Sequence, residues 1–175
     1  MRGRCLCGTV QFEIVGALPA LYQCHCSLCR KQSGAASNAA TIVDADQMRW
    51  LSGEGAVRSW KKATGFRSDF CSTCGSPVPN VLGDKPYYWV PAGLLEEDGA
   101  LRVAVHLHMG SKARWEPEPA GGTHHHDMPA FERKRPPAPY PIAPAPNIPI
   151  ISRGITSPRG GFRSCPAPLR PVDLG

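Results

Sequence analysis

Seven of the eight cysteines fall into three tight clusters, a spacing typical of metal ligands. Two short pairs can provide the four thiolates of a closed tetrahedral zinc site, whereas a triplet fills three corners and leaves the fourth open for water or a substrate. We therefore predict two zinc ions with different roles. The structural zinc is assigned to Cys5, Cys7, Cys71 and Cys74, and the catalytic zinc to Cys24, Cys26 and Cys29.

Each cysteine pair is followed by a glycine, Gly8 after the first and Gly75 after the second. A glycine there lets the turn fold back over a metal while backbone donors approach the sulfurs. Bringing the pairs together closes a loop of more than 60 residues, and metal binding would offset that loss of entropy. The alternative is disulfide pairing, which requires an oxidising compartment that the sequence does not indicate.

The triplet comes from one short segment and lacks a fourth ligand. In an extended stretch His25 points away from Cys24 and Cys26, so we expect it to hydrogen-bond a neighbouring group rather than to bind the metal. Ligation by His106 or His108 is an alternative that would make the site purely structural. An open zinc corner lowers the pKa of a bound thiol or water, and soft thiolate ligands favour a thiol guest.

The net charge of +6 is concentrated at one end of the chain. Residues 1–131 hold 13 Lys and Arg against 12 Asp and Glu, whereas residues 132–175 hold 7 against 2. Two zinc ions on seven thiolates would contribute a net charge of −3, because metal binding requires the deprotonated ligands. The metallated domain would then be slightly acidic, which argues against a nucleic-acid partner for the folded part.

The apolar residues are too scattered for a membrane segment. No stretch approaches the roughly 18 consecutive apolar residues of a spanning helix. Residues 1–5 lead straight into cysteines, without the apolar segment of a secretory signal. We therefore expect a cytoplasmic protein with no membrane partner, where thiols bind metals or react.

Short apolar runs separated by Gly, Asp and Pro predict a mainly β domain of small sheets. Val10, Phe12 and Ile14 alternate with polar residues, which is the period of a half-buried strand. Helix is expected only as a turn or two after Cys29 and near residues 94–98. The other predicted strands span residues 21–23, 39–43, 57–60, 66–71, 77–82, 87–92 and 101–106.

The composition changes near Phe131, where a segment rich in proline and arginine begins. Proline removes backbone donors and fixes φ, so residues 132–175 are predicted to form a disordered tail. The zinc domain is accordingly predicted to span residues 2–131. The tail carries the eighth cysteine, Cys165, which we expect to be a free thiol.

Longer motifs surround the cysteines and continue after them. They are Cys5-Leu6-Cys7-Gly8, Cys24-His25-Cys26-Ser27-x-Cys29-Arg30-Lys31 with Ser33-Gly34-Ala35, Phe70-Cys71-x-x-Cys74-Gly75-Ser76, His106-x-His108, Ser111-Lys112-Ala113-x-Trp115 and Met128-Pro129-x-Phe131. In order and spacing they resemble the glutathione-dependent formaldehyde-activating enzyme family. The resemblance runs from about Arg2 to Phe131.

This resemblance implies a zinc-stapled β fold similar to that of a Rab exchange-factor chaperone, with the same structural and catalytic zinc sites. It also implies a carbon–sulfur lyase that adds the thiol of glutathione to formaldehyde, giving S-hydroxymethylglutathione. The partners would be a glutathione-like thiol and an aldehyde. Our hypothesis is that the triplet zinc presents the thiolate and polarises the aldehyde nearby.

Several further side chains have open roles in this interpretation. Arg30 and Lys31 could contact substrate carboxylates or balance the charge of the cysteine cluster. The run His124 to His126 is expected on a solvated loop, and Trp50, Trp60, Trp89 and Trp115 are expected in the core or at its rim. The alternative function is a non-catalytic zinc module similar to centromere protein V. In that case the basic Pro-rich tail of this chain would bind a macromolecule.

Overall fold

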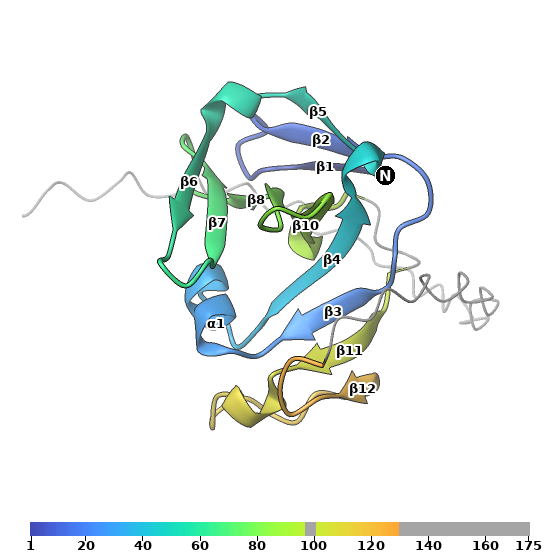
Figure 1. Cartoon of the computed structure of the whole chain (residues 1–175), viewed down its shortest axis with the longest axis vertical. Coiled ribbons are helices and arrows are strands. Elements are labelled where there is room, and N and C mark those ends of the chain that lie inside the picture. The colour runs from blue at the N-terminus through green and yellow to red at the C-terminus, as the bar shows by residue number, and fades with distance from the viewer. Residues whose placement is uncertain (97–100, 130–175) are drawn as a thin grey trace, which may run out of the picture. The chain divides into compact units, whose positions relative to one another are not determined.

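The structure is a computed structural model, and it describes residues 1–96 and 101–129 (Figure 1). Every described residue belongs to a single compact unit. The predicted tail, Cys165 and the predicted domain boundary at residue 131 lie outside the described residues.

The described residues form a mainly β fold, as predicted, with three sheets. One sheet has the order β1-β2-β5, with strands Arg2–Arg4, Gln11–Ile14 and Met48–Ser52. The largest has the order β12-β11-β3-β4-β10-β9, with strands Thr123–His124, Val103–Leu107, Leu21–Cys24, Asn38–Asp44, Tyr87–Pro91 and Asn80–Val81. The third has the order β6-β7-β8, with strands Val57–Lys61, Arg67–Cys71 and Pro77–Val78.

Helical structure in the described part is one α-helix, α1 (Ser27–Ser33), and four single 3-10 turns. The turns are η1 (Ala45–Gln47), η2 (Glu54–Ala56), η3 (Ala92–Leu94) and η4 (Met109–Ser111). The helical turn predicted after Cys29 is present, but the helix starts earlier than expected. The helix begins at Ser27 because the side chain of Cys26 caps it, accepting a hydrogen bond from the backbone N–H of Cys29. None of the described helices is long and apolar enough to cross a bilayer.

The predicted strands are found with shifted ends. Val10, Phe12 and Ile14 are completely buried, which confirms the alternating pattern. The run 77–82 is divided into β8 and β9, and Pro79 lies between them. The sequence patterns did not indicate β1, β5 or β12, because these short strands are defined by their pairing partners rather than by an apolar run of their own.

Two groups of buried side chains form the core. One consists of Phe12, Ile14, Val43, Met48 and Val90. The second includes two cysteine thiols, and its members are Cys5, Val10, Cys71 and Val78. Two of the predicted zinc ligands are therefore part of the hydrophobic core.

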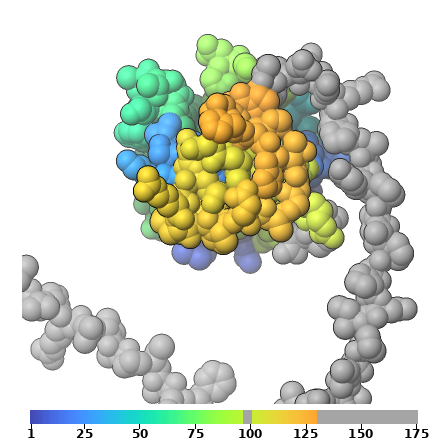
Figure 2. Space-filling view, turned by 90° about the horizontal axis from the view of Figure 1, so that it is seen from below, coloured from blue at the N-terminus to red at the C-terminus, as the bar shows by residue number. Residues whose placement is uncertain are grey.

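The closing segment of the described chain, residues 101–129, contributes two strands to the sheet that contains β3. β11 runs parallel to β3, and Leu107 is the register partner of Cys24. Figure 1 shows α1 at the end of β3, and a hydrogen bond of 3.0 Å from Gln32 Nε2 to Ser68 Oγ joins α1 to β7. Seen from below, residues 101–129 make up most of one face of the molecule (Figure 2).

Candidate metal centres

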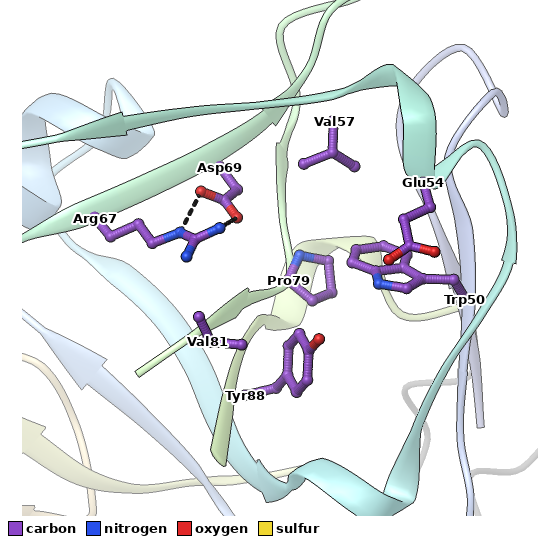
Figure 3. A pocket seen from close by; sticks show the side chains of 8 residues that line it. All are labelled: Trp50, Glu54, Val57, Arg67, Asp69, Pro79, Val81 and Tyr88. Carbon is purple, nitrogen blue, oxygen red and sulfur yellow. Dashed lines mark hydrogen bonds and ion pairs between the residues drawn. The ribbon is translucent and has the colours of Figure 1, made fainter. Parts of the chain in front are cut away.

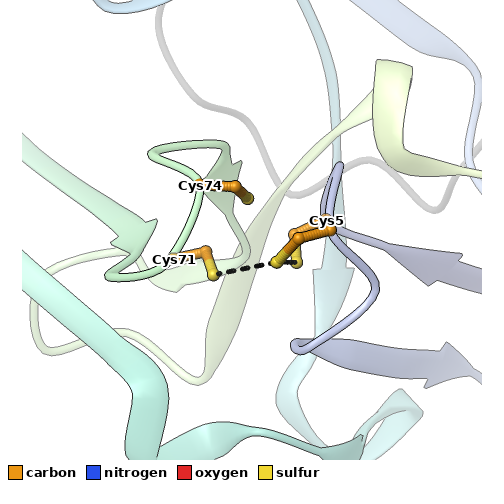
Figure 4. Close-up of side chains that lie close together, drawn as sticks. Cys5, Cys71 and Cys74 are labelled. Atoms are coloured by element: carbon orange, nitrogen blue, oxygen red, sulfur yellow. Dashed lines mark hydrogen bonds between the residues drawn. The ribbon is translucent and has the colours of Figure 1, made fainter.

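The two cysteine pairs meet between two hairpins. Cys5 and Cys7 lie in the turn between β1 and β2, and Cys71 and Cys74 lie at the turn between β7 and β8. All four sulfur atoms are within 4.8 Å of one another (Figure 4). The Sγ atoms of Cys5 and Cys7 are 3.5 Å apart, and those of Cys7 and Cys71 are 3.8 Å apart. The described cysteines form no disulfide, so the alternative of paired disulfides is not supported.

The turns around this group have the predicted glycine geometry. Gly8 and Gly75 adopt φ angles of 77° and 74°, in the left-handed region that glycine adopts without strain. Backbone groups also approach the sulfurs, since the N–H of Val10 donates to Cys5 Sγ at 3.3 Å. The N–H of Leu6 donates to Ser76 Oγ at 3.1 Å and joins the two turns directly.

Burial and hydrogen bonding shift the pKa values of Cys5 and Cys74 in opposite directions. Burial raises the pKa of Cys5 to about 11. Hydrogen bonds from the side chain and backbone of Ser76 lower the pKa of Cys74 to about 5. Four convergent sulfur donors match the ligand set of a closed zinc site, and a divalent cation would offset the cost of ionising the buried thiols.

The triplet lies where β3 ends and α1 begins. Cys24 ends the strand, Cys26 caps the helix and Cys29 lies in its first turn. Their sulfur atoms are within 4.8 Å of one another, and the described residues contribute no further His, Cys, Asp or Glu to this group. The geometry therefore provides three ligands from one short segment.

The three thiols interact strongly. A hydrogen bond from Cys29 lowers the pKa of Cys24 to about 6. The same bond, with burial and the charge of Cys24, raises the pKa of Cys29. Burial, followed by the negative charges at Cys29 and Cys24, also raises the pKa of Tyr22. Tyr22 was missed from the sequence, although its position two residues before Cys24 in a strand places both side chains on the same face.

His25 is completely buried and makes side-chain hydrogen bonds, as predicted. Its Nδ1 lies 2.9 and 3.1 Å from the two carboxylate oxygens of Glu116, and its Nε2 lies 3.1 Å from Nδ1 of His106. Neither His25 nor His106 belongs to the triplet group. His108 is also outside that group, and it adopts a left-handed φ of 57° directly after β11.

Arg30 and the histidine run make contacts that the sequence did not indicate. The guanidinium of Arg30 donates to the carbonyl oxygens of His25 and Ser111, so it connects the triplet loop to the closing segment. The run His124 to His126 does not lie wholly on a loop. His124 belongs to β12, and its ring contacts that of His106 with centroids 4.8 Å apart, because the backbone of β12 pairs with β11.

The four tryptophans have different environments. Trp89 is buried, with 8% of its surface exposed, and Trp50 is partly buried against the core. Trp60 and Trp115 are 54% and 72% exposed, so the prediction of core or rim positions is wrong for these two. Neither packs within a described core cluster.

A small cavity of about 120 Å³ is lined by residues from several strands (Figure 3). Arg67 and Asp69 form a bidentate ion pair on one wall of the cavity, with hydrogen bonds of 2.7 and 2.6 Å. The other residues that line the cavity are Trp50, Glu54, Val57, Pro79, Val81 and Tyr88. None of the seven clustered cysteines lines it.

The fold and the two cysteine groups define a small β protein that could hold two metal ions, consistent with zinc. The sequence profile of the family described as glutathione-dependent formaldehyde-activating enzyme matches residues 1–111, more than half of the chain, and the chain belongs to this family. Its function is accordingly related to glutathione and formaldehyde.

A crystal structure of a protein from Rhodobacter sphaeroides is similar at 25% sequence identity and a TM-score of 0.46. The similarity covers 55% of this chain and 88% of the other. None of the curated proteins matches.

Proposed function

We propose that the chain is a zinc-dependent carbon–sulfur lyase that forms or breaks a thiol–aldehyde adduct, such as S-hydroxymethylglutathione from glutathione and formaldehyde. The observation that carries this proposal is the triplet of Cys24, Cys26 and Cys29, whose sulfurs converge within 4.8 Å without a fourth described ligand. Three protein ligands and an open position are the pattern of a catalytic zinc site, whereas closed sites are structural. Family membership supports the choice of thiol and aldehyde.

The group of four cysteines is proposed as the structural site. Its ligands come from two hairpins that are more than 60 residues apart in the chain, and two of them are in the core. A metal there would hold the β1-β2-β5 sheet to the β6-β7-β8 sheet. The four sulfurs of this group would fill all four corners of a tetrahedral zinc site, and the residues Cys5 and Cys71 are only 2% and 0% exposed.

The reaction places specific demands on the residues around the triplet. In the direction of synthesis, the thiol sulfur forms a bond to the carbonyl carbon, the C=O double bond becomes a single bond, and the thiol proton ends on that oxygen. When bound, zinc would supply a lower pKa for a coordinated thiol and a positive charge near the developing oxyanion. The cysteines would hold the ion, and their fixed backbone would leave one side of it accessible to the two reactants.

Two other side chains would support this chemistry. Tyr22, like any tyrosine, is protonated at neutral pH, and burial and the cysteine charges raise its pKa further, so its hydroxyl could serve as a hydrogen-bond donor near the triplet. Arg30 lies in α1, and its hydrogen bonds to the carbonyls of His25 and Ser111 would hold the loop that contains the proposed ligands. In this proposal Arg30 positions the loop rather than the substrate.

The test compares one cysteine from each group. Cys26→Ser should lose one of two zinc ions and the formation of S-hydroxymethylglutathione above the spontaneous rate, while the remaining ion keeps the domain folded. The matched variant Cys7→Ser should lose the fold, since its site joins two sheets. Zinc content, circular dichroism and NMR detection of the adduct provide the three measurements. Wild-type activity in Cys26→Ser, or a triplet zinc that never takes up an added thiol, would exclude the proposal.

A further inference from the structure

Three buried titratable side chains form a hydrogen-bonded row next to the segment that carries Cys24, Cys26 and Cys29. The exposed fractions of Glu116, His25 and His106 are 9%, 0% and 2%. The Glu116 carboxylate contacts His25 Nδ1 at 2.9 Å, and His25 Nε2 contacts His106 Nδ1 at 3.1 Å. The cysteine groups do not include any of the three. Burying such groups is costly unless they are hydrogen-bonded, and the hydrogen bonds between these three side chains offset that cost.

One member of the row, His25, separates two of the proposed ligands. It lies between Cys24 and Cys26 in the chain, so its backbone angles set the relative directions of their side chains. Its backbone is also held, since its N–H donates to the carbonyl of Leu107 at 2.9 Å and its carbonyl accepts from Arg30 at 3.2 Å. Hydrogen bonds at both ring nitrogens hold the side chain of His25 in one orientation.

The row is anchored at both ends by the backbone. His106 Nε2 is buried and has no hydrogen-bond partner among the described residues, so the side-chain hydrogen bonds of the row end there. The backbone of His106 is held in β11, where its carbonyl accepts from the N–H of His125 at 2.8 Å, and the backbone of Glu116 is held as well. The N–H of Glu116 donates to the carbonyl of Ala113 at 3.1 Å, and its carbonyl accepts a hydrogen bond of 2.6 Å from Lys112 Nζ. Glu116 lies beyond the part of the chain that matches the family profile, residues 1–111.

We infer that Glu116 is a positioning residue for the metal centre at Cys24, Cys26 and Cys29, acting through the ring of His25. This inference rests on the proposed function, because it requires the triplet to hold a metal. Residues that orient the ligands of a metal typically change its affinity by about 10–100-fold when they are removed. The segment after Ser111 thereby completes a site whose ligands all lie near the N-terminus.

The experiment measures zinc affinity at each site of the full chain by competition with a chromophoric chelator. The Cys26→Ser variant, which lacks the triplet site, assigns the two binding steps. Glu116→Ala should weaken zinc binding at the triplet by about 10–100-fold and leave the four-cysteine site unchanged. Glu116→Gln keeps an oxygen that accepts from His25 Nδ1, so it should restore the affinity to within about threefold of wild type.

Glu118→Ala is the matched control. Glu118 belongs to the same segment and pairs with Lys112 and His124, but its side chain is 66% exposed and forms neither an ion pair nor a hydrogen bond with the side chains of Glu116, His25 or His106 in the described structure. Its replacement should leave both zinc affinities at their wild-type values. Wild-type triplet affinity in Glu116→Ala would overturn the inference, and so would an equal loss in Glu118→Ala.

A failure of folding has its own readout. If Glu116→Ala also loses zinc from the four-cysteine site, Glu116→Asp is measured in its place, because it keeps the charge but withdraws the carboxylate from His25 by one methylene. Weaker triplet binding in that variant supports the inference, and unchanged binding overturns it. If the wild-type protein binds two zinc ions and substitution of Glu116 does not change zinc affinity at the triplet, this inference alone is refuted. If the triplet of the wild-type protein binds no zinc, the proposed function is refuted as well.

Discussion

At the scale of single residues, the triplet depends on how its three thiols share protons. Cys24 has a lowered pKa and Cys29 a raised one, because the thiol of Cys29 donates to the thiolate of Cys24. A metal that binds all three sulfurs must displace the remaining protons. The adjacent His25 faces the other way and is fixed by its own hydrogen bonds. Two of the proposed ligands, Cys24 and Cys26, therefore flank a residue whose side chain is bonded elsewhere.

One glycine outside the cysteine motifs is required by close backbone contact. Gly53 has a φ of 71°, and a Cβ atom added there would lie 2.1 Å from the carbonyl oxygen of Thr9. Because both the dihedral angle and the neighbouring backbone resist a side chain, Gly53→Ala should lower the free energy of unfolding by about 1–3 kcal/mol. Urea denaturation of the zinc-loaded protein measures this change.

Gly55 provides the matched control for that substitution. A Cβ atom there meets nothing within 4 Å, and Gly55 is not among the described glycines with positive φ. Gly55→Ala should therefore change the free energy of unfolding by less than about 1 kcal/mol. Equal effects of the two substitutions would show that the contact with Thr9 does not govern stability.

At the scale of elements, β7 connects several parts of the site. It ends at Cys71, and Ser68 within it accepts the hydrogen bond that holds α1. It also carries the Arg67–Asp69 ion pair on the wall of the cavity in Figure 3. Asp69 is 3% exposed, so the pair contributes to fixing a strand that supports both cysteine groups.

Removing one partner of this pair should destabilise the fold. Asp69→Ala leaves the guanidinium of Arg67 without its carboxylate in a site where Arg67 is only 24% exposed. We expect the free energy of unfolding to fall by about 3 kcal/mol, the lower end of the range for breaking a buried ion pair. The double variant Asp69→Leu with Arg67→Met should regain part of this loss, because both charges are gone. A double variant no more stable than Asp69→Ala would contradict this account.

At the scale of the whole molecule, the four-cysteine group joins hairpins from different sheets. The first hairpin carries β1 and β2, and the second carries β7 and β8. Cys5 and Cys71 are core residues that contact Val10 and Val78. A metal at this group would therefore stabilise the fold by linking distant segments, in the way that a covalent crosslink does.

Metal removal should accordingly unfold the described domain. A strong chelator at neutral pH should abolish its β-sheet circular dichroism in a single transition, and readdition of zinc should restore it. The Cys26→Ser variant should behave in the same way, since it retains the four-cysteine group. Native circular dichroism in a chelated protein shown to be free of zinc would contradict a structural role for this group.

The sequence by itself determined the two cysteine groups, the family, and the mainly β class. Ligand spacing and alternating residues such as Val10, Phe12 and Ile14 are local patterns, and local patterns can be read without the fold. The glycine turns at Gly8 and Gly75 were predicted for the same reason.

Only the tertiary structure decided what lies behind the ligands. The contact between His25 and Glu116 joins residues 91 positions apart, and that between His25 and His106 joins residues 81 apart. No periodicity specifies such pairs, because they depend on β11 packing parallel to β3 and on the path of the chain after it. Short strands such as β1 and β12 were missed for the same physical reason, since their hydrogen-bond partners come from elsewhere in the chain.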